Sequence, residues 1–247
     1  MTRSTYLVFP LAALLNSFST TALLLIFGLA GHTEVAADIA LVQAASLALF
    51  YAFSANARNL VLADKESGGK SASGTLLKIR AALMFPLAFA TYIFGVVVGG
   101  AAASVATVLI VRRVTEWIGE IALACHERKD QHRQAFHSLF IESSVLLLAV
   151  VLPIGYSIEL SLSALPWALA PLLALRGAGL SFVGPRLASR KLLPHLGSTA
   201  IIGASVFVFR LSISLLAGKA VAGILFTAFA LGGLIPTVFG QALARLY

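Results

Sequence analysis

Four ionisable side chains lie within an otherwise apolar stretch, residues 105–125. They are Arg112, Arg113, Glu116 and Glu120. An α-helix turns about 100° per residue, so all four fall within about 100° of one another on one face. An ionisable group near the centre of a bilayer costs at least about 2.5 kcal/mol, so such groups face a bundle interior or a water-filled cavity. The spacing therefore predicts a helix whose charged side is turned inward.

Arginine predominates among the ionisable residues expected within apolar segments. These residues are Arg112, Arg113, Arg176, Arg210, Glu116, Glu120 and Glu142. A guanidinium group stays charged when buried and makes bidentate hydrogen bonds to phosphate. The set therefore favours a cavity that holds an anionic group such as a diphosphate. The alternative is structural: Arg112 pairs with Glu116 one turn away, and the charges only tie helices together.

The composition indicates the elements that must position these groups. Of 247 residues, 59% are hydrophobic and only 11% are charged, and the mean hydropathy is +0.95. Soluble domains carry about 25% charged residues. Apolar runs of about 20 residues span a bilayer as helices, which satisfy their own backbone hydrogen bonds there. We therefore expect an all-α fold, a polytopic bundle of transmembrane helices.

About eight spans are expected. They cover residues 6–30, 35–62, 76–98, 105–125, 135–156, 162–183, 198–217 and 221–244. The uncharged region 81–111 contains 31 residues, which as one helix would be about 46 Å long, well beyond a bilayer core. A tight reversal at Gly99 and Gly100 is expected instead.

The basic residues predict the orientation. If the N-terminus is inside, nearly all Lys and Arg of the connecting segments fall on the cytoplasmic side, and only Lys219 falls outside. The outer turns carry Glu34, Asp38 and Glu159. Both termini are therefore expected inside. The net charge of +8 is explained by this asymmetry, so no nucleic-acid partner is expected.

Motifs for nucleotide or metal binding do not match. The segment SGGKS lacks the spacing of a phosphate-binding loop, because Asp64 stands where a glycine is required. The run HERKDQH lacks the HExxH spacing that places two imidazoles on one helix face. A single cysteine, Cys125, cannot form a disulfide within the chain. No cofactor, no metal and no catalytic residue is expected.

Several segments resemble a known transporter family. They are SANARNLVLAD, LLKIRAAL, ACHERKDQHRQAF and FRLSISLLAGKAVAGILFTAFALGGLIPTVFGQAL. They resemble helices 2 to 5, 7 and 8 of the polysaccharide and lipid-linked oligosaccharide flippases, which belong to the exporter superfamily that also contains multidrug extruders. The resemblance covers nearly the whole chain without a strict signature. It implies a six-helix N-terminal lobe at residues 1–190 and the first two helices of an incomplete second lobe at residues 191–247.

The resemblance also implies a function. Such a protein exports a polyprenyl-diphosphate-linked glycan across the bacterial inner (plasma) membrane by alternating access around a central site. Its residues would contact the anionic head group, donate neutral hydrogen bonds to sugar, and balance charge or couple an ion. The residues expected in these roles are, in that order, Arg112, Arg113 and Arg210, then Asn16 and Gln43, then Glu116 and Glu120.

Two other functions remain open from the sequence. An integral membrane enzyme of lipid or glycan metabolism would gather acids and histidines at one interface, and His126, Glu127, Asp130 and His132 do cluster in the sequence. An inactive or truncated membrane partner protein would account for the short second lobe. Self-association, or a separate C-terminal lobe, would complete the transporter.

Overall fold

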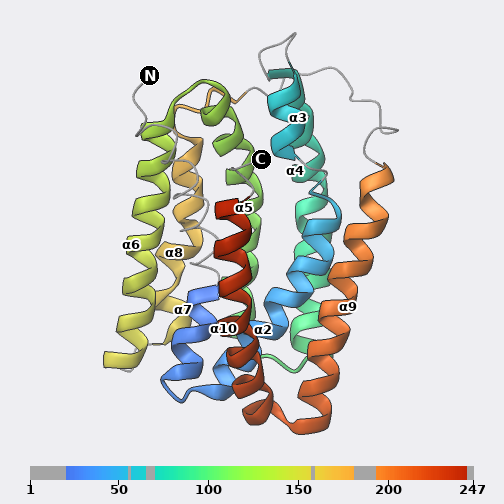
Figure 1. Cartoon of the computed structure of the whole chain (residues 1–247), viewed down its shortest axis with the longest axis vertical. Coiled ribbons are helices and arrows are strands. Elements are labelled where there is room, and N and C mark those ends of the chain that lie inside the picture. The colour runs from blue at the N-terminus through green and yellow to red at the C-terminus, as the bar shows by residue number, and fades with distance from the viewer. Residues whose placement is uncertain (1–20, 55–56, 65–69, 157–158, 181–192, 244–247) are drawn as a thin grey trace.

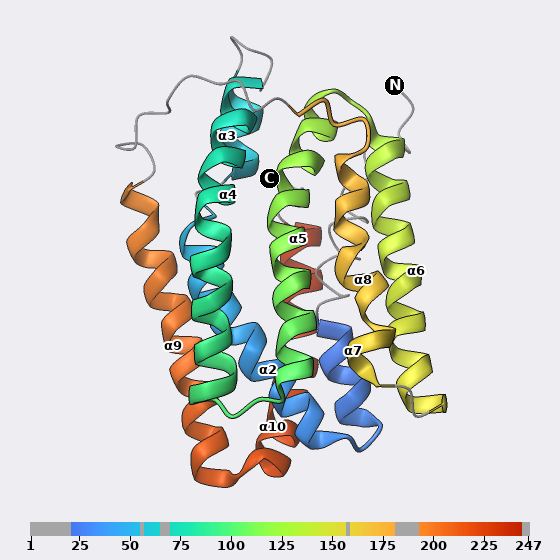
Figure 2. The same cartoon turned by 180° about the vertical axis from the view of Figure 1, so that it is seen from behind.

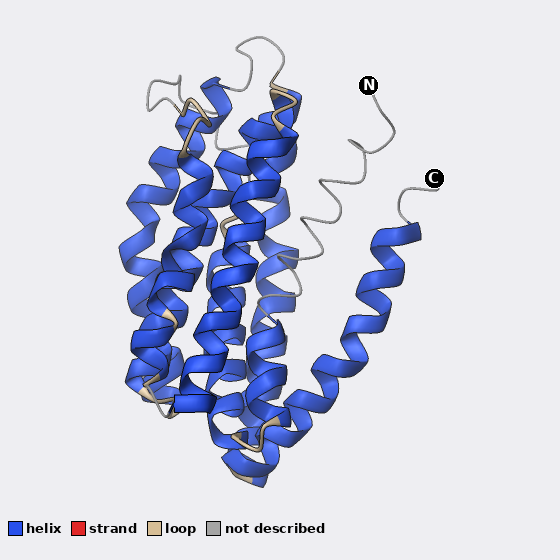
Figure 3. Cartoon of the chain, turned by 90° about the vertical axis from the view of Figure 1, so that its left-hand side faces the viewer, coloured by secondary structure: helices blue, strands red, loops and turns tan. Residues whose placement is uncertain are grey.

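The computed structural model describes residues 21–54, 57–64, 70–156, 159–180 and 193–243. Its regular elements are all helices, and no strand occurs among these residues (Figure 3). Four of the described helices are long and apolar enough to cross a membrane. They are Thr33–Tyr51, Ala72–Val98, Arg133–Ile154 and Ala200–Ala217. The expected all-α class is confirmed for the described residues.

Helix α5 (Ala103–Arg128) runs through the middle of the bundle. In Figure 2 it stands between α4 (Lys70–Tyr92) on one side and α6 (His132–Tyr156) on the other. The side of α5 opposite its charges is buried, with Ile110 and Ile121 in the hydrophobic core. The predicted apolar face of this helix therefore packs against protein. Its charged face also meets another helix, because Arg112 pairs with Glu142 of α6.

The predicted reversal at the end of residues 76–98 is confirmed. Helix α4 continues into a π-helical turn, η2 (Ile93–Val98), and Gly100 then adopts a φ of +67°. A left-handed backbone of this kind favours glycine, because a side chain would clash there. The chain reverses at this point, so region 81–111 forms parts of two helices.

The predicted helix at residues 35–62 is interrupted. It consists of α2 (Thr33–Ser46), a π-helical turn η1 (Leu47–Tyr51) and, after a break, α3 (Ala57–Ala63). Ser54 closes the end of the first part through a short-range hydrogen bond to the Tyr51 carbonyl. The Ser54 carbonyl accepts a hydrogen bond from the Ala57 N–H at 3.1 Å and a second one from Arg80 of α4 at 3.2 Å.

The predicted helix at residues 162–183 is wrong in its length and continuity. The structure has two short helices, α7 (Leu160–Ser163) and α8 (Leu165–Leu169), followed by a 3-10 segment, η3 (Ala170–Leu175). Pro166 and Pro171 occupy the first turns of α8 and η3, where the missing proline N–H does no harm. Arg176, expected within the membrane, follows η3 with an extended backbone and is exposed.

The last two helices pack on the first part of the chain. Helices α9 (Leu193–Ala217) and α10 (Lys219–Leu243) meet at Gly218, whose φ is +78°. Helix α10 lies against α2 so closely that a Cβ on Gly223 would overlap the Thr33 carbonyl. The C-terminal half of α10 then leans away from the bundle (Figure 3).

One end of the bundle is joined by an ion pair between distant segments. Lys219 Nζ lies 2.7 Å from Asp38 Oδ1 and also donates a hydrogen bond to the Gly100 carbonyl. Asp38 Oδ2 accepts a hydrogen bond from the Ala102 N–H at 2.9 Å. These contacts tie α10, α2 and the turn before α5 together at the end where α2, α5 and α10 begin (Figure 1).

Candidate functional site

A cavity of about 200 Å³ lies between α2, α5, α8 and α9. We call it the basic cavity. The lining residues that bear charge, hydrogen-bonding groups or an aromatic ring include Gln43, Arg112, Arg113, Glu116, Trp167 and Arg210. The structure thus brings together five of the residues that the sequence singled out. Of the other two, Asn16 lies outside the described residues, and Glu120 lines a different cavity.

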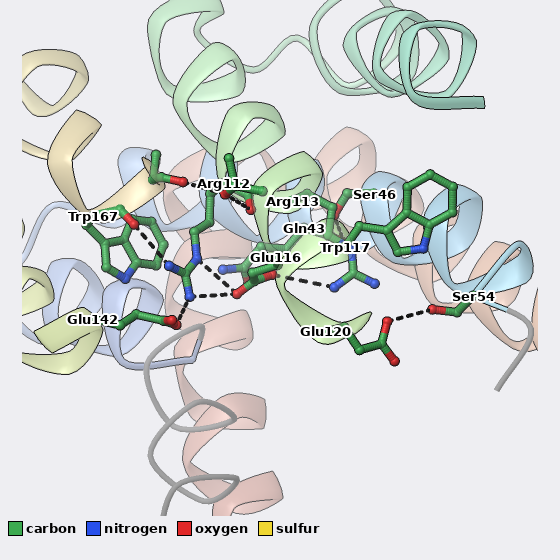
Figure 4. Close-up of polar contacts among 12 residues, drawn as sticks. Gln43, Ser46, Ser54, Arg112, Arg113, Glu116, Trp117, Glu120, Glu142 and Trp167 are labelled. Carbon is green, nitrogen blue, oxygen red and sulfur yellow. Dashed lines mark hydrogen bonds and ion pairs between the residues drawn. The ribbon is translucent and has the colours of Figure 1, made fainter. Parts of the chain in front are cut away.

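Arg112 is fully engaged by neighbouring helices (Figure 4). Its guanidinium group forms ion pairs with Glu116 at 2.8 Å and with Glu142 of α6. It donates a hydrogen bond to the Trp167 carbonyl at 2.9 Å, and its Cζ lies 4.5 Å from the centre of the Trp167 ring. Arg112 is 2% exposed, the expected ion pair with Glu116 is present, and these contacts tie α5 to α6 and α8.

Arg113 is held much more loosely. Its ion pair with Glu116 Oε2 spans 3.5 Å, and 24% of its side chain is exposed. Its buried Nε has no hydrogen-bond partner among the described residues. Figure 4 shows Arg112 and Arg113 on opposite sides of Glu116. Because a guanidinium group has five N–H donors, Arg113 retains donors for a ligand in the cavity.

Arg210 reaches the cavity from α9. The close packing of α9 on η1 positions it, since a Cβ on Gly203 would come within 2.5 Å of Ala48 Cα. Its Nη1 donates a hydrogen bond to the Ala40 carbonyl at 2.7 Å, and its Cζ lies 5.7 Å from the centre of the Phe226 ring. No carboxylate pairs with Arg210 in the described part of the chain.

The charges around the basic cavity do not cancel. Three arginines line it, and only Glu116 and the neighbouring Glu142 compensate them within the described residues. The remaining positive charge belongs to the pair Arg113 and Arg210, because Arg112 holds two carboxylates. A desolvated anion with several oxygens, such as a diphosphate, would satisfy both guanidinium groups.

A second cavity, of about 160 Å³, lies on the other side of Glu116. We call it the acidic cavity. Its charged lining residues are Arg58, Glu116, Glu120, Glu127 and Glu142. Glu116 is the one charged side chain among the described residues that lines both cavities. The two predicted charge-balancing residues therefore differ, since Glu120 does not reach the basic cavity.

Arg80 of α4 is a buried charge that was not among the expected site residues. It is 1% exposed within the bundle. It pairs with Glu120 at 2.8 Å, donates hydrogen bonds to the carbonyls of Trp117 and Ser54, and stacks 5.0 Å from the Trp117 ring. The sequence signal for this pair is Glu120. No Lys or Arg lies one helical turn from it on α5, so a cation had to come from another helix.

The histidine cluster considered for an enzyme is structural at its centre. His126 is completely buried, and its ring nitrogens lie 2.9 Å from Gln131 Oε1 and 2.8 Å from the Ala174 carbonyl. Glu127 forms an ion pair with Arg58. In the described part of the chain, no group of three or more His, Cys, Asp or Glu side chains is arranged to hold a metal ion.

Comparisons with known proteins add no assignment: no family model, no curated protein and no solved structure matches the chain.

Proposed function

We propose that this chain is a flippase-like membrane transporter that moves a polyprenyl-diphosphate-linked oligosaccharide or polysaccharide precursor across the bacterial inner membrane. The observation that carries the proposal is the basic cavity, in which the positive charges of Arg113 and Arg210, from α5 and α9, are only partly compensated by the described residues. Arginine pairs bind diphosphate oxygens through charge-assisted, bidentate hydrogen bonds. Binding, and not chemistry, is the task that such a cavity supports.

The cavity residues divide into two roles under this proposal. Arg113 and Arg210 contact the diphosphate, while Arg112 holds the wall of the cavity in place through Glu142 and Trp167. Gln43, which also lines the cavity, donates a neutral hydrogen bond to the first sugar. Asn16 stays a predicted sugar contact, and Glu120 balances the charge of Arg80.

The proposed topology has about eight spans with both termini inside. Support comes from the apolar surface of the bundle, where large side chains such as Phe85 on α4 and Leu216 on α9 are exposed and would contact lipid. The ion pair between Lys219 and Asp38 would close the outer end, so the head group would enter from the cytoplasmic leaflet. Alternating access would open the outer end in turn.

A translocation assay in proteoliposomes tests the proposal. The full chain is reconstituted with a labelled polyprenyl-diphosphate oligosaccharide, and movement between leaflets is followed. Arg113→Ala and Arg210→Ala should each slow movement by at least about tenfold, because each removes a charge-assisted contact of about 1.5–3 kcal/mol. Arg133→Ala, which removes an exposed arginine of α6 outside the cavity, is the matched control. Parental rates in both cavity variants would contradict the assignment.

A further inference from the structure

Two exposed basic residues belong to segments that meet at one end of the bundle (Figure 2). Lys129 lies in the turn between α5 and α6, and its Nζ donates a hydrogen bond to the Ala178 carbonyl at 2.6 Å. Arg176 follows the 3-10 segment η3 with an extended backbone. We call this pair the basic corner. We propose that the basic corner binds the head group of an anionic phospholipid.

The backbone closes around the Lys129 ammonium group. A Cβ on Gly179 would come within 2.6 Å of Lys129 Nζ, and Gly179 has a φ of +63°, which favours glycine. The ammonium group has three N–H donors, and the Ala178 carbonyl accepts a hydrogen bond from it. Lys129 is therefore held in a defined position and retains donors for phosphate oxygens.

His126 fixes the turn and η3 to one another. Its ring is completely buried, and its nitrogens lie 2.9 Å from Gln131 Oε1 and 2.8 Å from the Ala174 carbonyl. Gln131 belongs to the turn that carries Lys129, and Ala174 belongs to η3, which leads into Arg176. The basic corner is thus a preformed part of the bundle.

The acids of these two segments compensate the basic corner only in part. Residues 175–180 contain no acidic residue, and Asp130 is the one acid of residues 129–131. Glu127, at the end of α5, is paired with Arg58 of α3. Arg176 forms no ion pair within the part of the chain that the structure describes. An anion can therefore supply the missing negative charge.

The basic corner lies where apolar segments end. The apolar stretch Leu160–Leu175 ends directly before Arg176, and the membrane-length stretch Arg133–Ile154 begins just after the turn. Leu172 and Leu173 of η3 are 36% and 40% exposed. Head groups lie at the level where apolar spans end. One phospholipid can therefore place its phosphate on the basic corner and its acyl chains along η3.

A head group with net negative charge fits this surface better than a zwitterionic one. Phosphatidylcholine brings its own ammonium group toward Lys129 and Arg176, whereas phosphatidylglycerol carries only hydroxyl groups beside its phosphate. Basic residues at the ends of spans attract anionic lipids, each by about fivefold in affinity. The inference concerns a surface outside both cavities. It rests on the proposed membrane location, but not on transport of a glycan.

Native mass spectrometry of the full chain in detergent tests the proposal. Titration with phosphatidylglycerol or phosphatidylcholine gives the dissociation constant of the first lipid bound. The parent should bind phosphatidylglycerol at least about tenfold more tightly, because two basic residues contribute. Arg176→Gln should weaken binding of phosphatidylglycerol by about fivefold and leave phosphatidylcholine unchanged. Lys129→Gln keeps an N–H donor for the Ala178 carbonyl and should show the same loss, so the test stands even if Arg176→Gln does not fold.

Arg133→Gln is the matched control. It removes the charge of another exposed arginine at the same end of the bundle, on α6 and outside the basic corner, so affinity for phosphatidylglycerol should match that of the parent. If Arg133→Gln weakens binding as much as Arg176→Gln does, the overall charge of this end attracts the lipid and the proposed site is wrong. Equal affinities of the parent for the two lipids would also overturn it.

The outcomes separate this inference from the proposed function. The lipid titration measures neither diphosphate binding nor translocation, so a failed translocation assay would leave its result standing. Loss of the preference for phosphatidylglycerol would overturn the basic corner and leave the basic cavity untouched. If the parent binds neither lipid, the membrane location and the basic corner are both wrong.

Discussion

The arginines of this bundle occur in two kinds of surroundings. Arg80 and Arg112 are almost fully buried, and each pairs with a glutamate of α5, donates to a backbone carbonyl and stacks on a tryptophan ring. Arg113 and Arg210 border a cavity, and the described residues leave them a distant carboxylate or none. The role of a buried arginine therefore does not follow from its residue type alone. Arginines whose charge is paired with a nearby carboxylate join helices, and arginines whose charge is only partly compensated are available to a ligand.

The largest difference should appear when Arg112 is removed. Arg112→Ala leaves Glu142, which is 4% exposed, without its cation, and breaking a buried pair costs about 3–5 kcal/mol. Arg113→Ala breaks only a long, partly exposed pair, which is worth about 0–1 kcal/mol. Unfolding of both variants in detergent, followed by circular dichroism, measures the contrast. Equal losses of stability would end the distinction between the two neighbours.

The ion pair between Arg80 and Glu120 offers a second, smaller contrast, between its two members. Glu120→Ala leaves Arg80 buried and without a counter-charge, for which about 3 kcal/mol is expected. Arg80→Ala leaves Glu120, whose side chain is 42% exposed, in contact with water, so the loss should be about 1–2 kcal/mol. The order of the two midpoints in the same unfolding experiment checks the argument, and the reverse order would show that Glu120 is less hydrated than its exposure indicates.

The cavity arginines should show the opposite pattern, with a small effect on stability and a large one on binding. Arg210→Ala forfeits a hydrogen bond to the Ala40 carbonyl, worth about 1 kcal/mol, while pyrophosphate affinity should fall by about tenfold or more. Thermal unfolding and calorimetric titration of the same sample give both values. A large loss of stability without any change in affinity would place Arg210 with the helix-joining arginines.

The smallest effect is expected at the end of the bundle. Asp38→Asn removes the ion pair to Lys219, whose side chain is 34% exposed. Lys219 keeps its hydrogen bond to the Gly100 carbonyl, and the amide oxygen of the new side chain can accept from the Ala102 N–H as Asp38 does, so the loss should be below about 1 kcal/mol. Unfolding midpoints at low and high salt test this, since an exposed pair is screened by salt. A loss as large as that of Arg112→Ala would mean that compensation is not what separates these sites.

The sequence predicted the fold where a local signal exists. The left-handed residues Gly100 and Gly218 mark the reversals before α5 and α10, and the span length of residues 135–156 gave α6 within a few residues. It did not predict the interruption after Tyr51, where the Ser54 carbonyl accepts a hydrogen bond from Arg80 of another helix. It also did not predict that α8 and η3 begin near Pro166 and Pro171. Proline occurs both in the first turn of a helix and at a kink within a long one, so the sequence does not distinguish the two cases.

The sequence predicts which arginines line the candidate site, but not which of them join helices and which are available to a ligand. Arg112, Arg113 and Arg210 stand out as charges in apolar segments, and they do line one cavity. Arg112 and Arg113 are adjacent in the sequence, however, and differ by about 100° around α5. Which of them contacts Glu142 and Trp167 depends on how α6 and α8 pack against α5. That packing involves segments far apart in the sequence and has no local sequence signal.

The most direct test of the central claim is an experimental structure of the full chain with a short-chain polyprenyl diphosphate. We expect diphosphate oxygens within about 3 Å of the Arg113 and Arg210 guanidinium groups, with Arg112 still paired to Glu142. Diphosphate bound elsewhere on the bundle, with Arg113 still on Glu116, would contradict it.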